Sequence, residues 1–90
     1  MISTRILHAQ AIAAYSPQNI ATALEQLEQV LKDADITEEQ CAHTYLVCYE
    51  LSGYLDQGAK NKALELYEKL YAKTPKFIYN HNMELLSKQR

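Results

Sequence analysis

Apolar residues recur every three or four positions along almost the whole 90-residue chain, and strict alternation of apolar and polar residues never persists. This spacing gathers apolar side chains on one face of an α-helix, whereas a half-buried strand needs a period of two. The chain also contains only two glycines and two prolines, too few for the turns of a many-stranded sandwich or barrel. The pattern therefore predicts an all-α protein of about five helices and no strands.

Start and stop signals divide the chain into these helices. Ser16-Pro17 and Thr74-Pro75 each combine an N-cap residue with a proline that fits the first helical position. Thr37 followed three residues later by Gln40 predicts a capping box. The expected helices cover residues 3–15, 17–33, 37 to 56 or 57, 59 or 61 to 73, and 75–89.

The third expected helix is apolar and aromatic on most sides, so it is either central to the core or a surface for a partner. Gly53 lies inside it and predicts close approach of a neighbouring helix, at an intrinsic cost of about 1 kcal/mol. Gly58 is expected to end it.

Size and cysteine content predict one small cytoplasmic domain. A chain of 10.3 kDa with 48% hydrophobic and 22% charged residues has room for a single, thin core. Cys41 and Cys48 would lie roughly 10 Å apart on one helix, beyond disulfide reach, so we expect free thiols in a reducing compartment. No apolar run is long enough to span a membrane, and Arg5, His8 and Gln10 interrupt the segment that most resembles a signal peptide.

Residues 54–75 contain Tyr54, Gly58, Ala63, Tyr67 and Pro75 in this order. These residues, at these spacings, resemble the second half of a tetratricopeptide repeat. In that family the glycine makes the turn between two helices, the alanine lets them touch, the aromatic residue fills the space between repeats, and the proline starts the next helix.

The first two helices fit a second, degenerate copy of this pattern forty residues earlier. The matching sets are Ala23, Leu27 and Val30 against Ala63, Tyr67 and Leu70. The third helix departs from the family, because Glu50 and Leu51 stand where a large and then a small residue belong. Either this helix is rotated or the turn after it carries an insertion.

The resemblance implies two antiparallel helical hairpins and a capping helix within a single domain, residues 1–90. The degenerate first hairpin is residues 2–33, the second hairpin residues 37–73 and the C-terminal capping helix residues 75–89. A plain five-helix bundle remains the alternative architecture.

The chain has no motif that indicates catalysis, a metal or a cofactor. Cys41, His43 and Cys48 cannot converge on one ion, because His43 lies about 200° around the helix from Cys41, and no CxxC or HxxxH pair adds ligands. A phosphate-binding loop and a paired-carboxylate motif are also absent from the sequence. We therefore expect a protein that is not an enzyme.

Charge is unevenly distributed along the chain. The net charge of −2 argues against nucleic acid as a partner, because that binding needs a concentrated cationic surface. Residues 25–39 carry six acids and one base, a net −5, whereas residues 69–90 carry five bases and one acid, a net +4. This polarity indicates either solvated outer faces or electrostatic orientation of a partner.

The resemblance also implies a concave surface, made mostly by the first helix of each pair, that binds a peptide or an amphipathic helix. The family's ligand-facing positions fall on eight residues of this chain: Arg5, His8, Ile12, Tyr15, Tyr45, Cys48, Ser52 and Leu55. Among them the expected anchors are Ile12, Tyr15, Tyr45 and Leu55.

These features predict a small cytoplasmic adaptor or chaperone that holds a helical segment of another protein. Size, acidity and repeat number are similar to those of the small tetratricopeptide-like chaperones of bacterial type III secretion. That resemblance implies an aggregation-prone needle or translocator subunit as client, often with a small helical co-chaperone. The alternative is a homodimerising structural bundle, whose self-interface would use the third helix and some of the seven tyrosines.

Overall fold

The computed structural model describes residues 2–15 and 17–88, with side chains for residues 4–15 and 18–88. All five expected helices are present, and no strand occurs in this part of the chain, so the all-α prediction is confirmed. The α-helices are α1 (Ile2–Tyr15), α2 (Ile20–Leu31), α3 (Glu38–Leu51), α4 (Gln57–Lys73) and α5 (Phe77–Lys88), and a 3₁₀ helix, η1 (Pro17–Asn19), precedes α2.

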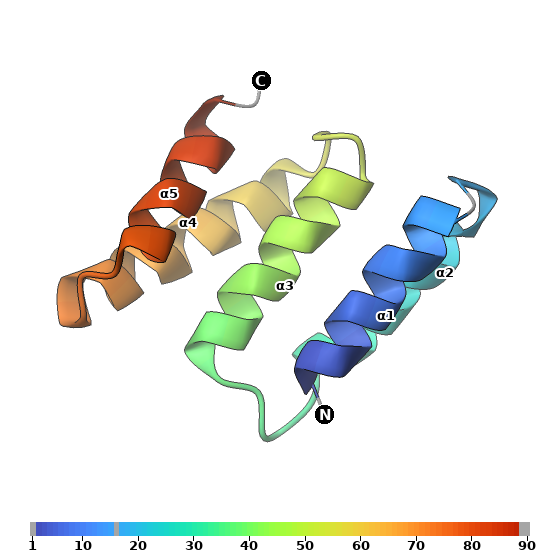
Figure 1. Ribbon diagram of the computed structural model, residues 1–90, viewed down its shortest axis with the longest axis horizontal. Coiled ribbons are helices and arrows are strands. Elements are labelled where there is room, and N and C mark those ends of the chain that lie inside the picture. Colours follow the sequence, from blue (N-terminus) through green and yellow to red (C-terminus); the bar gives the residue numbers. More distant parts are fainter. Residues whose placement is uncertain (1, 16, 89–90) are drawn as a thin grey trace.

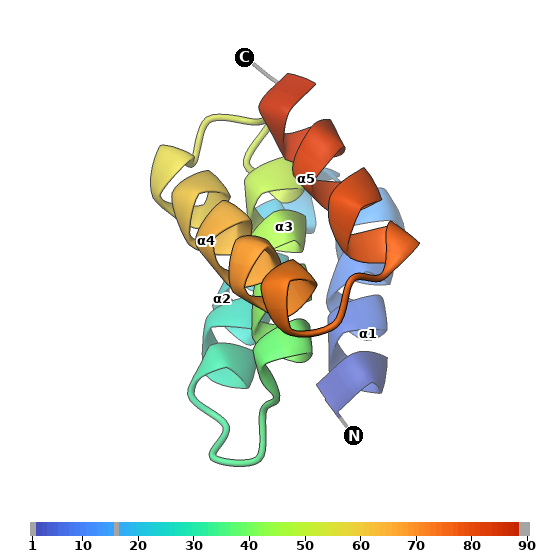
Figure 2. The same ribbon diagram turned by 90° about the vertical axis from the view of Figure 1, so that its left-hand side faces the viewer.

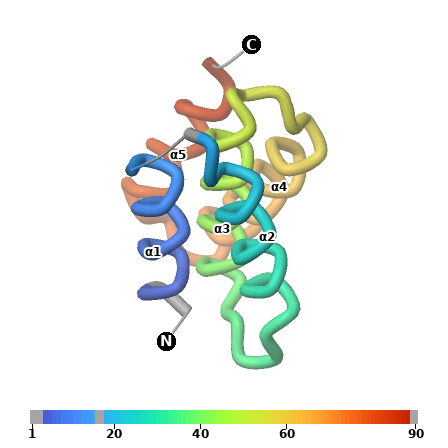
Figure 3. Tube along the Cα trace, turned by 90° about the vertical axis from the view of Figure 1, so that its right-hand side faces the viewer, coloured from blue at the N-terminus to red at the C-terminus, as the bar shows by residue number. Residues whose placement is uncertain are grey.

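The helices form two layers, with consecutive helices packed against each other (Figure 1). Helices α1, α3 and α5 lie in the front layer, and α2 and α4 lie behind them. The side views agree on this division, and Figure 2 shows α3 set back between α1 and α5. The opposite side view shows α1 beside α2 and both against α3 (Figure 3). The front layer is therefore concave along α3.

Helix α3 lies at the centre of the core, with one of its sides left for a possible partner surface. Its buried residues lie around most of the helix: Ala42, Thr44, Leu46, Val47, Cys48 and Tyr49. Alanines with almost no exposed surface let the neighbouring helices approach closely: Ala9, Ala23, Ala42, Ala59 and Ala63. Tyr67 is also buried and lies against Tyr79 of α5, with ring centroids 6.1 Å apart.

The capping box at the start of α3 is confirmed. The Thr37 hydroxyl accepts a hydrogen bond from the Gln40 backbone N–H at 3.1 Å, and the Gln40 side-chain oxygen accepts one from the Thr37 N–H at 3.0 Å. The expected cap at Ser16 lies outside the described residues. Helix α5 begins at Phe77, two residues after the predicted start at Pro75.

The predictions for the end of the third helix were wrong. Helix α3 ends at Leu51, because Gly53 and Tyr54 both adopt left-handed backbone conformations, with φ of 73° and 66°, which a right-handed helix cannot contain. No atom lies within 4 Å of a side chain built on Gly53, so this glycine permits the turn and not a close helix contact. Gly58 lies in the first turn of α4, which Asp56 caps by accepting a hydrogen bond from the Ala59 N–H at 3.0 Å.

The capping box predicts a stability effect that can be measured by chemical denaturation. Thr37→Ala removes the side-chain acceptor for the Gln40 N–H, so we expect the free energy of unfolding to fall by about 1 kcal/mol. Thr22→Ala is the matched control, because Thr22 is exposed inside α2, where alanine is the better helix former. Equal losses in both variants would show that the capping box does not stabilise α3.

Candidate functional site

Three adjoining cavities follow α3 on the concave side of the front layer. The first, of about 350 Å³, lies between α1 and the start of α3, and the second, of about 210 Å³, lies between α3 and α5; both are lined by Glu39 and His43. The third, of about 110 Å³, lies between the ends of α3 and α5 and shares Leu46 with the second. Neighbouring cavities share lining residues along one side of α3, and we call the three together the α3 groove.

The floor of the α3 groove is a single stripe of α3. Its residues, Glu39, His43, Leu46 and Glu50, are spaced by four, three and four positions, which keeps them on one face of the helix. The eleven steps from residue 39 to residue 50 span about 16 Å of helix, so the floor corresponds to about three helical turns. A groove of this length matches a short helical segment.

Helix α5 forms one wall and is attached to the floor by a hydrogen bond. The Tyr79 hydroxyl donates to a Glu39 carboxylate oxygen at 3.1 Å, while the Tyr79 ring packs on Tyr67. Ile78 and Leu85 stand at the rim of the groove with 47% and 40% of their surface exposed. The wall therefore has a fixed base and an exposed apolar edge.

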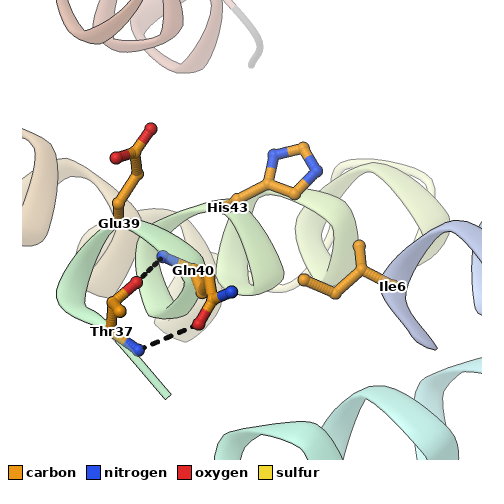
Figure 4. A pocket seen from close by; sticks show the side chains of 5 residues that line it. All are labelled: Ile6, Thr37, Glu39, Gln40 and His43. Carbon is orange, nitrogen blue, oxygen red and sulfur yellow. Dashed lines mark hydrogen bonds between the residues drawn. The ribbon is translucent and has the colours of Figure 1, made fainter. Parts of the chain in front are cut away.

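Helix α1 forms the other wall near the start of α3. Ile6 is buried and reaches toward Gln40 and His43, and Glu39 and His43 project from the same side of α3, one turn apart (Figure 4). An ion pair between Arg5 and Asp33, 2.9 Å apart, attaches α1 to the loop after α2. These contacts position α1 against the floor.

The polar groups of the groove are acidic or neutral. Burial lowers the pKa of His43, an effect that the Glu39 carboxylate partly opposes, so His43 is neutral at pH 7. Burial raises the pKa of Glu50. The basic C-terminal part supplies no cation to the floor: among the described residues Lys73 pairs with Glu38, with 3.4 Å between its nitrogen and the carboxylate, and Lys76 lies over the Tyr79 ring.

The eight residues predicted to bind a partner do not meet in one place, and none of them lines the α3 groove. Arg5 and His8 line a cavity of about 260 Å³ with Gln26 and Gln29 of α2. Tyr45 and Cys48 line a different cavity, of about 420 Å³, together with residues of α2 and α4. The other four are dispersed: Tyr15 and Leu55 are exposed, and Ile12 and Ser52 are half-buried. The binding role of all eight residues stays a prediction.

The α3 groove was not predicted from the sequence, because the family alignment selected other positions of α3. The family alignment placed Tyr45 and Cys48 on the concave side, whereas the structure places Leu46 and Glu50 there. The mismatch at Glu50 and Leu51 was a sign that α3 departs from the repeat pattern. A second signal was the polar series Glu39, His43 and Glu50, which marks the uncovered side of an otherwise apolar helix.

The two cysteines are free thiols, as predicted, with Cys41 half-buried and Cys48 buried. Burial raises the pKa of Cys41, and raises that of Cys48 to about 11, with the Asp56 and Glu28 carboxylates adding to the effect. Both groups are therefore protonated and weakly nucleophilic near neutral pH. No group of three histidine, cysteine or acidic side chains in the described part could hold a metal ion.

Comparison with known protein families, with curated proteins and with solved structures finds no match for this chain. No family is identified. Over residues 2–15 and 17–88, no helix is both long enough and apolar enough to cross a membrane. The structure itself shows a small five-helix protein with sequentially packed helices.

Burial of Cys48 and Tyr67 predicts loss of stability in alkali. The pKa of Cys48 is raised from 9.0 to about 11 and that of Tyr67 from 10.0 to about 12. Above pH 9 the unfolded chain loses these protons before the folded chain does, so the free energy of unfolding falls as pH rises from 9 to 12. Denaturation at a series of pH values measures the decline, which should be shallower between pH 9 and 11 in Cys48→Ala. An unchanged slope in that variant would contradict the assignment.

Proposed function

We propose that this chain is a non-catalytic binding module that holds an amphipathic helical segment of another protein in the α3 groove. The observation that carries the proposal is the succession of three cavities, sharing lining residues, along one side of the central helix. A helix at the centre of a core is usually covered by other helices on all sides. A side that the chain itself leaves open therefore suggests a surface that a partner covers.

The chemistry of the groove suits an amphipathic helix. Ile78 and Leu85 offer an exposed apolar edge, Leu46 lies at the bottom, and Glu39 and Glu50 supply polar partners along the floor. Helix-in-groove recognition uses apolar anchors at intervals of three or four residues, and a floor of three turns accommodates two or three of them.

The helical layers support a tetratricopeptide-like arrangement. The first helices of the two hairpins, α1 and α3, share the concave layer with α5, as the resemblance implies for the ligand-binding side (Figure 1). We extend the proposal to a cytoplasmic adaptor or chaperone whose client is a small helical protein, with a type III secretion needle or translocator subunit as the narrower candidate. Two protonated, unpaired thiols are compatible with a reducing compartment.

The homodimerising bundle, with the third helix as its self-interface, is a weaker candidate. Its proposed self-interface used the third helix, most of which lies in the core of this chain. Sedimentation equilibrium at several concentrations separates the two proposals, because a homodimer forms without any partner whereas a binding module stays monomeric until its client is added.

The proposed site predicts a difference between two exposed apolar residues. Ile78→Glu places a charge on the groove rim and should weaken binding of a small helical protein encoded beside this chain by at least tenfold. Leu55→Glu changes a residue that is 80% exposed outside the groove and should leave the affinity within about twofold. Titration calorimetry with the purified pair measures both dissociation constants.

The same pair of variants also tests the sequence-derived site, because Leu55 belongs to it and Ile78 does not. Loss of binding in Leu55→Glu with normal binding in Ile78→Glu would overturn the groove as the binding site. Circular dichroism must first show that both variants keep the helical content of the parent chain.

A further inference from the structure

The third cavity of the α3 groove holds two polar groups that the rest of the chain leaves unused. Tyr49 has no exposed surface, and its hydroxyl has no hydrogen-bond partner. Burying a hydroxyl without a partner is unfavourable, and such groups in native proteins need an explanation. Glu50 is next to it in the chain, lines the same cavity, and takes part in no recorded ion pair among the described residues.

The remaining walls of this cavity are apolar. Leu46 comes from α3, Leu85 and Leu86 from α5, and Tyr54 from the turn between α3 and α4. Of the two leucines on α5, Leu86 is fully buried and Leu85 is 40% exposed, so the cavity has a dry inner end and an open mouth.

Tyr54 is held at this position by an unfavourable backbone conformation. A φ of 66° is uncommon for a residue other than glycine, asparagine or aspartate, and residues in such conformations cluster at functional sites. The ring of Tyr54 packs edge-on against Tyr49, with centroids 5.5 Å apart. A glycine at position 54 would form the same turn with less strain, whereas Tyr54 adds an aromatic ring to the cavity wall.

We propose that the third cavity is the anchor site for one lysine or arginine side chain of the bound helix. The aliphatic stem packs on Leu46 and Leu85, and the cationic head pairs with the Glu50 carboxylate. A long cationic side chain meets both requirements of the cavity, because it combines an apolar stem with a head that only donates hydrogen bonds. This inference rests on the proposed function and specifies the chemistry of its partner.

Charge complementarity selects a cation over the other polar side chains. An acidic side chain would be repelled by the Glu50 carboxylate, and an apolar side chain would leave that carboxylate without a partner. Lys60 lies over the face of the Tyr49 ring, 5.9 Å from its centroid, and does not line the cavity.

A displayed library of 18-residue amphipathic helices tests the inference on the intact chain. The library has a fixed leucine stripe and randomised flanking positions, and it is selected against the immobilised full-length protein. We expect selected helices to carry lysine or arginine at one flanking position, and selection against Glu50→Gln to remove that preference. Glu68→Gln, an exposed acid on α4 outside the groove, is the matched control and should leave the preference unchanged.

The affinity of the best selected helix gives a second measure. Replacing its basic residue with norleucine should weaken binding to the parent chain three- to tenfold and should have little effect on binding to Glu50→Gln. Tyr49→Phe should unfold at the same or a higher denaturant concentration, because it removes a buried hydroxyl that has no partner.

The possible failures are distinguishable. Helices that bind Ile78→Glu as well as the parent chain would overturn the groove itself, and with it the proposed function. Helices that need Ile78 but show no basic preference, or keep that preference against Glu50→Gln, would overturn only the anchor site.

Discussion

The packing of α3 against α1, α2 and α4 is the constraint on which the rest of this structure depends. A chain of 90 residues can form only one thin core, and here that core is a single helix surrounded by alanine-rich contacts. Ala42 on α3 and Ala63 on α4 have no exposed surface, so the two helices pack closely enough to bury Tyr49 and Tyr67. A larger side chain at either alanine would push α3 and α4 apart, and the packing of the other helices depends on this pair.

The same constraint produces the groove. Helices α2 and α4 pack on α3, while α1 and α5 lie on either side of it in the front view (Figure 1). Three front helices and two back helices leave one side of the central helix with fewer neighbours, and its polar residues Glu39, His43 and Glu50 face that side. The hydrogen bond from Tyr79 to Glu39 joins a wall to the floor, so the site and the fold use some of the same side chains.

The sequence was sufficient for the fold class and for local signals, and insufficient for the orientation of α3. The Thr37–Gln40 capping box and the helical period depend on neighbouring residues and were predicted correctly. The faces of α3 could not be distinguished by hydrophobicity, because its apolar residues surround it, and a rotation of 100° exchanges Tyr45 for Leu46 in the groove. The end of α3 was missed because Tyr54 is not a residue type that predicts a left-handed turn.

The turn after α3 determines both where this helix ends and how the groove is closed at that end. If α3 continued to residue 56, Tyr54 would lie on the helix and could not close the third cavity. Ending the helix at Leu51 allows Ser52 to donate a hydrogen bond to the Tyr49 carbonyl and to accept one from the Asp56 N–H, while Asp56 caps α4. These local bonds offset the strain at Tyr54 and hold its ring against Tyr49. The position of the groove's closed end therefore follows from turn chemistry that is specific to this chain and absent from the repeat pattern that it resembles.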